Sequence, residues 1–190
     1  PALQGPLGAF EDVVVTDSTV MRLNELLEKQ YPACRTNHTK AALKMHAVIS
    51  VRGKGSNSVK LTSQRKHDGP VFKIGNWVKN SLLLFDLGYF KYRLFAEIEK
   101  RGGYFLSRLK SNVDPVIVKE NEQWKIGRTR LENKNLRDVV ETIKRDTIDV
   151  MVRIPYRKRR YGKRKSGRLC KETFRVVGVR NTENRQWHLY

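Results

Sequence analysis

Apolar and polar positions along the first 110 residues follow the periods of short strands and helices. Residues 13–15 are three valines, and the run ends on polar residues at 16–19, which predicts a buried strand. Apolar residues then recur near helical spacing over residues 20–27, and Tyr31 and Pro32 close the segment. This second pattern predicts a helix.

A β-hairpin is predicted next. Apolar and polar residues alternate from Leu43 to Val51, a polar turn follows at residues 53–57, and residues 59–63 return as the second strand. On the first of these strands Lys44 and His46 share the polar face, opposite the apolar residues.

Two further strands and a helix complete the pattern up to residue 110. Residues 67–78 predict a short helical stretch, and residues 82–85 are apolar on both faces, as a central parallel strand would be. Residues 89–100 predict an amphipathic helix that stops at Gly102 and Gly103, and residues 104–110 predict a strand. This order of elements favours a mixed α/β domain.

The pattern changes after Asp114 and Pro115. Residues 120–144 are rich in charge, with weak helical propensity over 136–143. Residues 148–154 and 174–178 alternate as two strands, and residues 186–190 resemble one more. We therefore predict two parts, an α/β core over residues 1–112 and a β-rich insertion over residues 113–190.

The charge of the chain indicates a polyanionic partner. Lys and Arg number 39 against 19 Asp and Glu among 190 residues, a net charge of +20. Nucleic acid is the favoured partner, because such an excess repels itself unless phosphates neutralise it. A membrane is disfavoured, since the longest central apolar run, residues 82–85, is far too short to span a bilayer.

Cysteine usage and the first residues indicate a reducing, cytoplasmic setting. Cys34 and Cys170 lie far apart, without partners at metal-ligand spacing, so neither a disulfide framework nor a zinc site is expected. Residues 1–10 lack the charged start and apolar core of a signal peptide.

Two carboxylates follow apolar strands. Asp17 comes soon after residues 13–15, and Asp86 directly follows residues 82–85. Residues beyond the carboxyl ends of strands meet in a common crevice of an α/β sheet, where paired carboxylates attract a hard divalent ion such as Mg²⁺. The alternatives are that Asp17 caps the next helix and that Asp86 only begins a turn.

Five short motifs occur in a recognisable order, at residues 15–19, 44–46, 67–69, 84–89 and 104–110. Together they resemble the DDE transposases of the insertion-sequence-four family over residues 12–112, and residues 187–190 are also similar to that family. The resemblance implies an RNase H-like mixed sheet core interrupted by a β-rich insertion. It further implies Mg²⁺-dependent (or Mn²⁺-dependent) cleavage and strand transfer of transposon DNA ends, with Asp17 and Asp86 as the first two catalytic metal ligands.

The resemblance also implies a third carboxylate, a Glu on a helix after the insertion. Tyr161 and Arg164 fit the start of the family's spacing pattern, but position 168 is Arg, and neither Glu172 nor Glu183 stands in the pattern. We therefore expect that the C-terminal part of the core is missing and that this chain alone is inactive. Full-length relatives act as homo-oligomers, so a partner copy is implied in the same way.

The predicted DNA contacts lie mainly in one basic segment. Residues 153–171 hold ten Lys or Arg in nineteen positions, with Tyr156 and Tyr161 interleaved, which favours a hairpin laid along phosphates over a merely solvated loop. Its candidate DNA-binding residues are Arg157, Lys158, Arg159, Arg160, Lys163, Arg164, Lys165 and Arg168.

Other polar residues receive weaker expectations. Lys44 and His46 are candidate phosphate contacts through the resemblance, with outward-facing polarity as the alternative. Arg108 and Lys110, at the end of the last predicted core strand, are candidates to hold a phosphate. His67 and Asp68 are expected to cap a helix, and Tyr89 to pack.

Two other functions fit the charge. One is a non-catalytic basic nucleic-acid-binding protein, which explains the excess of Lys and Arg but not the two acids after buried strands. The other is an inactive transposase remnant that binds DNA without cutting it. The favoured interpretation is a transposase fragment active in DNA transposition and recombination, in the cytoplasm and associated with the nucleoid.

Overall fold

The computed structural model describes residues 5–34, 39–55, 57–66, 72–121, 130–157 and 169–190. The chain divides into two compact units, Pro1–Ser107 and Arg108–Tyr190. Among the helices that the structure describes, none combines the length and the apolar character needed to cross a membrane.

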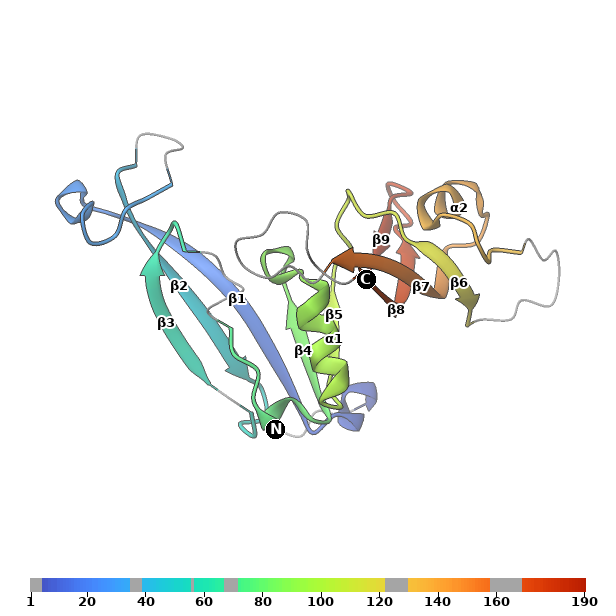
Figure 1. The fold of residues 1–190 in the computed structure, drawn as a ribbon, viewed down its shortest axis with the longest axis horizontal. Helices are drawn as coiled ribbons and strands as arrows, with labels where there is room; N and C mark the ends of the chain where they lie inside the picture. The colour runs from blue at the N-terminus through green and yellow to red at the C-terminus, as the bar shows by residue number, and fades with distance from the viewer. Residues whose placement is uncertain (1–4, 35–38, 56, 67–71, 122–129, 158–168) are drawn as a thin grey trace. The chain divides into compact units, whose positions relative to one another are not determined.

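A mixed sheet forms the first unit (Figure 1). Its described strands are β1 (Asp12–Leu23), β2 (Ala41–Ser50), β3 (Ser58–Ser63), β4 (Ser81–Phe85) and β5 (Tyr104–Ser107), in the order β3-β2-β1-β4-β5. The pairs β1–β2 and β2–β3 are antiparallel, whereas β1–β4 and β4–β5 are parallel. Thus β1 lies centrally, between an antiparallel half and a parallel half.

One face of this sheet is covered by α1 (Tyr92–Lys100) (Figure 1). Aromatic side chains pack on the same face. Phe95 and Ile98 are the buried residues of α1, and the Phe95 ring stacks on Phe105 at 4.2 Å between centroids. Phe85 extends the cluster towards Phe72, with 5.3 Å between ring centroids. Short 3₁₀ helices span Gly5–Ala9, Glu25–Leu27, Asn76–Val78 and Leu87–Tyr89.

The opposite face of the first sheet stays open to solvent over its centre. Val15 pairs with Ile49 on one side and with Leu84 on the other, and Leu84 pairs with Leu106. Although apolar, Val15, Ile49 and Leu106 are 37%, 54% and 45% exposed. Because side chains alternate along a strand, Asp17 shares this open face with Val15.

An antiparallel sheet forms the second unit. Its described strands are β6 (Val116–Glu120), β7 (Thr147–Arg157), β8 (Leu169–Arg180) and β9 (Trp187–Leu189), in that order across the sheet. The helix α2 (Leu136–Thr142) contributes buried Leu136, Val139 and Val140. The core of this unit adds Ile117, Ile148, Val150, Val152, Phe174 and Val176.

The expected α/β class and mixed sheet are confirmed, and the sheet is compatible with an RNase H-like fold. The helix predicted from residue 20 is wrong: β1 continues to Leu23, paired with β2 as far as Ala41, and a 3₁₀ helix over Glu25–Leu27 follows. Of the predicted helical stretch 67–78, residues 67–71 lie outside the described residues, and a 3₁₀ helix covers only Asn76–Val78.

Candidate functional site

Asp17 and Asp86 occupy adjacent positions on neighbouring parallel strands. The register pairs Thr16 of β1 with Phe85 of β4, so continuing it by one residue brings Asp17 beside Asp86. Asp17 lies within β1, and Asp86 keeps an extended backbone, with φ −76° and ψ 163°. Neighbouring strands are about 4.8 Å apart, and residues at paired positions point to the same face.

The Asp17 and Asp86 side chains are open to solvent, while hydrogen bonds hold the backbone around them. Both aspartates are exposed, and Asp17 Oδ1 accepts a 2.7 Å hydrogen bond from the backbone N–H of Ser18. Directly before the pair, buried Thr16 donates its hydroxyl to the carbonyl oxygen of Leu84 at 2.9 Å, which ties β1 to β4.

Tyr89 adds a further link between the two aspartate-bearing segments. Its hydroxyl lies 3.4 Å from the backbone carbonyl oxygen of Asp17, to which it donates, and its ring packs 6.0 Å from that of Phe85. Tyr89 therefore packs, as its sequence position suggests, and also supports Asp17. The sequence gives only a weak signal for the supporting role of Thr16, a threonine directly after three valines, and none for that of Tyr89.

The described residues hold no cluster of three or more His, Cys, Asp or Glu side chains suited to a metal ion. Among the described residues, no third His, Cys, Asp or Glu therefore joins Asp17 and Asp86 in a metal-binding cluster. Two carboxylates supply hard oxygen ligands of the type that Mg²⁺ and Mn²⁺ accept, but they fill only part of a six-ligand sphere.

Lys44 and His46 lie on the covered face of the first sheet. His46 is 3% exposed, and its Nε2 is 2.9 Å from the hydroxyl oxygen of Thr62, so the alternative of outward-facing polarity is wrong for His46. Lys44 is half-buried and donates from Nζ to the carbonyl oxygen of Lys66 at 3.2 Å. The polar face of this strand is thus the one that packs against the rest of the unit.

The remaining candidates belong to the second unit or lie outside the described residues. Arg108 is exposed and Lys110 half-buried, and both fall in the second unit. Arg157 ends β7, but its side chain is outside the described part of the structure. The same holds for His67, Asp68, Lys158, Arg159, Arg160, Lys163, Arg164, Lys165 and Arg168.

Comparison with known families identifies the chain. The transposase DDE domain family matches residues 8–169, which include both aspartates and most of both units. The chain belongs to this family. Asp17, within β1, and Asp86, directly after β4, therefore lie in a DDE transposase domain.

One relative shows how much of a transposase the domain represents. The transposase for insertion sequence element IS1151 of Clostridium perfringens is 24% identical over 136 residues, which cover 70% of this chain. The same match covers 29% of the relative, so the DDE domain described here corresponds to less than a third of that protein.

Proposed function

We propose that this DDE domain holds Mg²⁺ or Mn²⁺ between Asp17 and Asp86 and serves metal-dependent cleavage and strand transfer of transposon DNA ends. The observation that carries the proposal is the β1–β4 register, which ends at Thr16 and Phe85 and leaves the two acids side by side. Their placement on one exposed face leaves room for a phosphodiester to approach.

The ligand chemistry fits the proposed ion. Two like-charged carboxylates on adjacent strands repel each other unless a proton or a cation lies between them. Divalent ions held by such oxygens polarise a phosphoryl group and lower the pKa of a bound water or hydroxyl. The protein itself supplies orientation, since the Thr16 hydroxyl ties β1 to β4 and the Tyr89 hydroxyl donates to the backbone carbonyl oxygen of Asp17.

The finer assignments belong to the same proposal. The ordered motifs favour the insertion-sequence-four branch of the DDE transposases, with the second unit as a β-rich insertion in the core. A third carboxylate, outside the described residues, would complete the metal site, and without it the chain is a weak catalyst or none. The basic segment at residues 157–168 would bind DNA, and a second copy would act on the other transposon end.

Metal binding tests the aspartate pair directly. Titration calorimetry with Mn²⁺ on the wild type, Asp17→Asn and Asp86→Asn should show at least about tenfold weaker binding in each variant, because removing one of two charged ligands costs more than about 1.4 kcal/mol. Glu28→Gln, a change of an exposed acid elsewhere in the same unit, is the matched control. Equal Mn²⁺ affinity in all four proteins would rule out a shared metal site.

A second candidate function is DNA binding without cleavage. The observation in its favour is that no third acidic ligand joins Asp17 and Asp86 among the described residues. A nicking assay with supercoiled DNA and Mn²⁺, run on this chain and on a version extended to include a downstream Glu, separates the two. Nicking by the extended chain that Asp86→Asn abolishes supports the nuclease, whereas DNA binding with no nicking by either chain supports the binder.

A further inference from the structure

A pocket of about 550 Å³ lies in the second unit, between the end of α2 and the turn that joins β8 to β9. Val140, Ile143 and Trp187 form its apolar wall. The charged residues around it are Lys144, Arg180 and Arg185, with Glu141 as the single carboxylate. The lining therefore carries more positive than negative charge.

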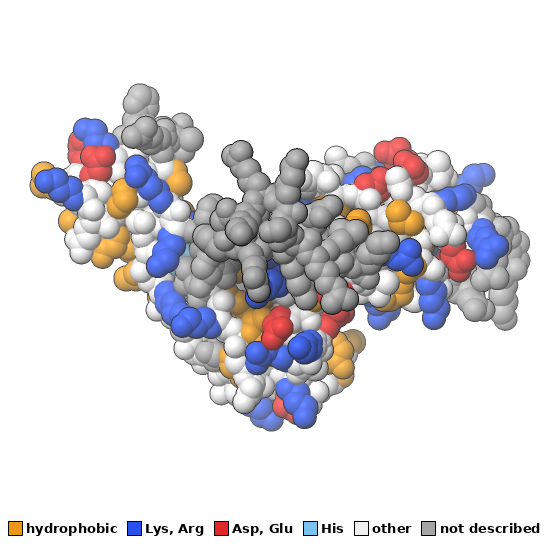
Figure 2. Space-filling model, viewed as in Figure 1, with side chains coloured by type: hydrophobic (Ala, Val, Ile, Leu, Met, Phe, Trp, Pro, Cys, Tyr) orange, Lys and Arg blue, Asp and Glu red, His pale blue; other side chains and the backbone are white. Residues whose placement is uncertain are grey.

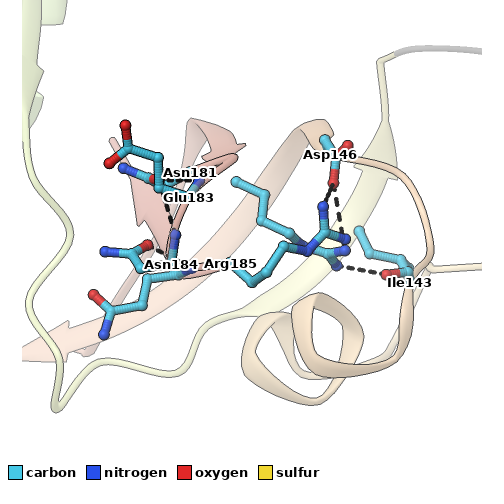
Figure 3. A network of polar contacts seen from close by, with 8 residues as sticks. Ile143, Asp146, Asn181, Glu183, Asn184 and Arg185 are labelled. Atoms are coloured by element: carbon cyan, nitrogen blue, oxygen red, sulfur yellow. Dashed lines mark hydrogen bonds and ion pairs between the residues drawn. The ribbon is translucent and has the colours of Figure 1, made fainter.

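Arg180 and Arg185 make different contacts. Arg180 donates from Nη2 to the carbonyl oxygen of Ile143 at 2.6 Å and lies 4.7 Å from the centroid of the Trp187 ring, so it closes the end of α2. Arg185 reaches Asp146, with 3.2 Å between Nη1 and Oδ1, and its side chain is 57% exposed (Figure 3). Arg185 therefore keeps donors that solvent or a ligand can reach.

Lys144 supplies a second accessible cation. It is exposed and, within the described part of the chain, makes no ion pair or hydrogen bond. Asp146 neutralises one arginine charge at most, because a single carboxylate carries one negative charge. The pocket and Asp146 together thus keep one positive charge in excess.

The backbone at Arg185 is held in the left-handed region, with φ 58°. For a residue with a Cβ this conformation costs about 1–2 kcal/mol, and glycine adopts it freely. The turn is fixed by Asn181, whose side-chain oxygen accepts from the N–H groups of Glu183 and Asn184 (Figure 3). Backbone strain of this kind recurs at ligand-binding sites, so it supports a binding role for Arg185.

Trp187 provides the third observation. Its indole N–H is buried and has no hydrogen-bond partner among the described residues. A buried donor without a partner costs about 1–3 kcal/mol. The Trp187 side chain lines the pocket, so its indole signal reports on a ligand bound there.

We infer that this pocket binds a phosphate group, held by the Arg185 guanidinium and the Lys144 ammonium, against the wall that Trp187 forms. Arginine suits the task because its planar fork donates two parallel hydrogen bonds to phosphate oxygens. The site goes beyond the proposed function, since it includes neither Asp17 nor Asp86 and needs no metal ion. The phosphate comes either from a DNA backbone or from free phosphate.

The indole N–H signals of the full chain test the site by NMR. We expect the Trp187 signal, assigned with Trp187→Phe, to shift saturably as inorganic phosphate is added at constant ionic strength. In Arg185→Gly the phosphate dissociation constant should rise at least about tenfold, because the variant loses the guanidinium charge and both of its hydrogen bonds to phosphate. This variant should fold at least as stably, because glycine relieves the backbone strain and the exposed ion pair with Asp146 contributes little.

Lys144→Gln and Lys119→Gln form a matched pair, since both lysines are exposed, both lie in the second unit, and only Lys144 lines the pocket. Weaker phosphate binding in Lys144→Gln alone supports the site. Equal weakening in the two variants, or a drift of all indole signals without saturation, overturns it. Repeating the titration with a short DNA duplex identifies the source: a shift of the Trp187 signal indicates backbone phosphate, and a response to inorganic phosphate alone indicates a free anion.

Discussion

At the scale of single residues, Asp12 is the most tightly held carboxylate that the structure describes in the first unit. It is 1% exposed, and its Oδ1 accepts from the backbone N–H groups of Val13 and Arg52 at 2.8 and 2.9 Å. Its Oδ2 accepts from the Ser50 hydroxyl. Asp12 thus fixes the start of β1 to the turn after β2.

The pKa of Asp12 lies below its ordinary value of 3.8. Burial alone would raise this pKa, but hydrogen bonds from Ser50 and from backbone N–H groups of Arg52, Gly55 and Val13 offset burial and lower it. A group with a depressed folded-state pKa contributes stability above its unfolded-state pKa. That contribution is lost as the pH falls through the folded-state value.

We predict that Asp12→Asn lowers the free energy of unfolding at neutral pH by about 1–3 kcal/mol, because it replaces charge-assisted hydrogen bonds with neutral ones. The difference from the wild type should shrink as the pH falls below 3.8. Urea unfolding of the wild type and of Asp12→Asn at several pH values measures this difference in the free energy of unfolding. Glu28→Gln, an exposed acid-to-amide change, should leave the stability nearly unchanged, and a pH-independent Asp12→Asn difference would contradict the electrostatic explanation.

The place of a single residue in the fold could be predicted from the sequence only where its immediate sequence neighbours indicate it. Asp17 and Asp86 both follow apolar runs, so their places on neighbouring strands could be predicted, but the expected end of the first strand near Asp17 is wrong, because β1 continues to Leu23. The burial of His46 could not be predicted, because alternation shows that two faces differ but not which one is covered. Asp12 also escaped notice, since its Ser50 partner lies 38 residues away.

At the scale of elements, β1 is the main departure from the predicted pattern. Val20, Met21 and Leu23 fit a helical spacing, yet they extend the strand because β2 offers ten consecutive paired positions, from Ser50 to Ala41. Pairing with a distant strand thus outweighs a local periodicity of a few residues. Other elements could be predicted, because their apolar patterns are not contradicted by pairing with a distant strand, or because glycines mark their ends. These are the strands that begin near residues 82, 104, 148 and 174 and the helix predicted from residue 89.

The link between β1 and β4 gives a prediction at this scale. Thr16→Val removes the hydroxyl that donates to the Leu84 carbonyl while keeping the side-chain shape, and should lower the free energy of unfolding by about 0.5–1.5 kcal/mol. If the strand ends position a metal ion, the affinity for Mn²⁺ should fall as well. Chemical denaturation and calorimetry measure the two effects.

Thr19→Val provides the control for this substitution. Thr19 is exposed further along β1, opposite Met45, where only β2 pairs with the strand. It should change neither stability nor Mn²⁺ affinity appreciably. If both threonine variants lose Mn²⁺ affinity equally, the Thr16 hydroxyl has no special part in holding the aspartates.

The second sheet depends on a close approach at Gly178 of β8. A Cβ there would lie 2.6 Å from Ile148 Cγ2 and 2.7 Å from Leu189 Cδ2. We predict that Gly178→Ala destabilises the protein by about 1–3 kcal/mol through overpacking, whereas Val179→Ala, at an exposed neighbour, stays within about 0.5 kcal/mol. Thermal unfolding of both variants measures the effect. An unchanged unfolding midpoint in Gly178→Ala would mean that the Ile148 and Leu189 side chains move aside at little cost.

At the scale of the whole molecule, the positive charge is uneven. The first unit carries 16 Lys and Arg against 9 Asp and Glu, and the shorter second unit carries 23 against 10. Figure 2 shows Lys and Arg side chains on the described surface of both units. The excess of the second unit includes the eight basic residues of the segment 157–168, so we expect this unit to dominate DNA affinity.

Salt dependence measures that contribution. The logarithm of the DNA association constant falls with the logarithm of salt concentration, with a slope of about −0.9 for each phosphate neutralised. Replacing Arg159, Arg160, Arg164 and Lys165 by Gln should therefore reduce the slope by about 3.6 if each contacts a phosphate. Fluorescence anisotropy with a labelled duplex, over a range of salt concentrations, gives the slopes.

A matched variant separates contact from overall charge. Changing Lys29, Lys54, Lys79 and Lys100, all exposed in the first unit, to Gln removes the same four charges. Counterion release depends on contacts, so this variant should keep most of the wild-type slope. If the salt-dependence slope falls equally in the two variants, DNA affinity depends only on the net charge, and the basic segment makes no phosphate contacts of its own. If only the segment variant loses slope, the second unit holds the DNA.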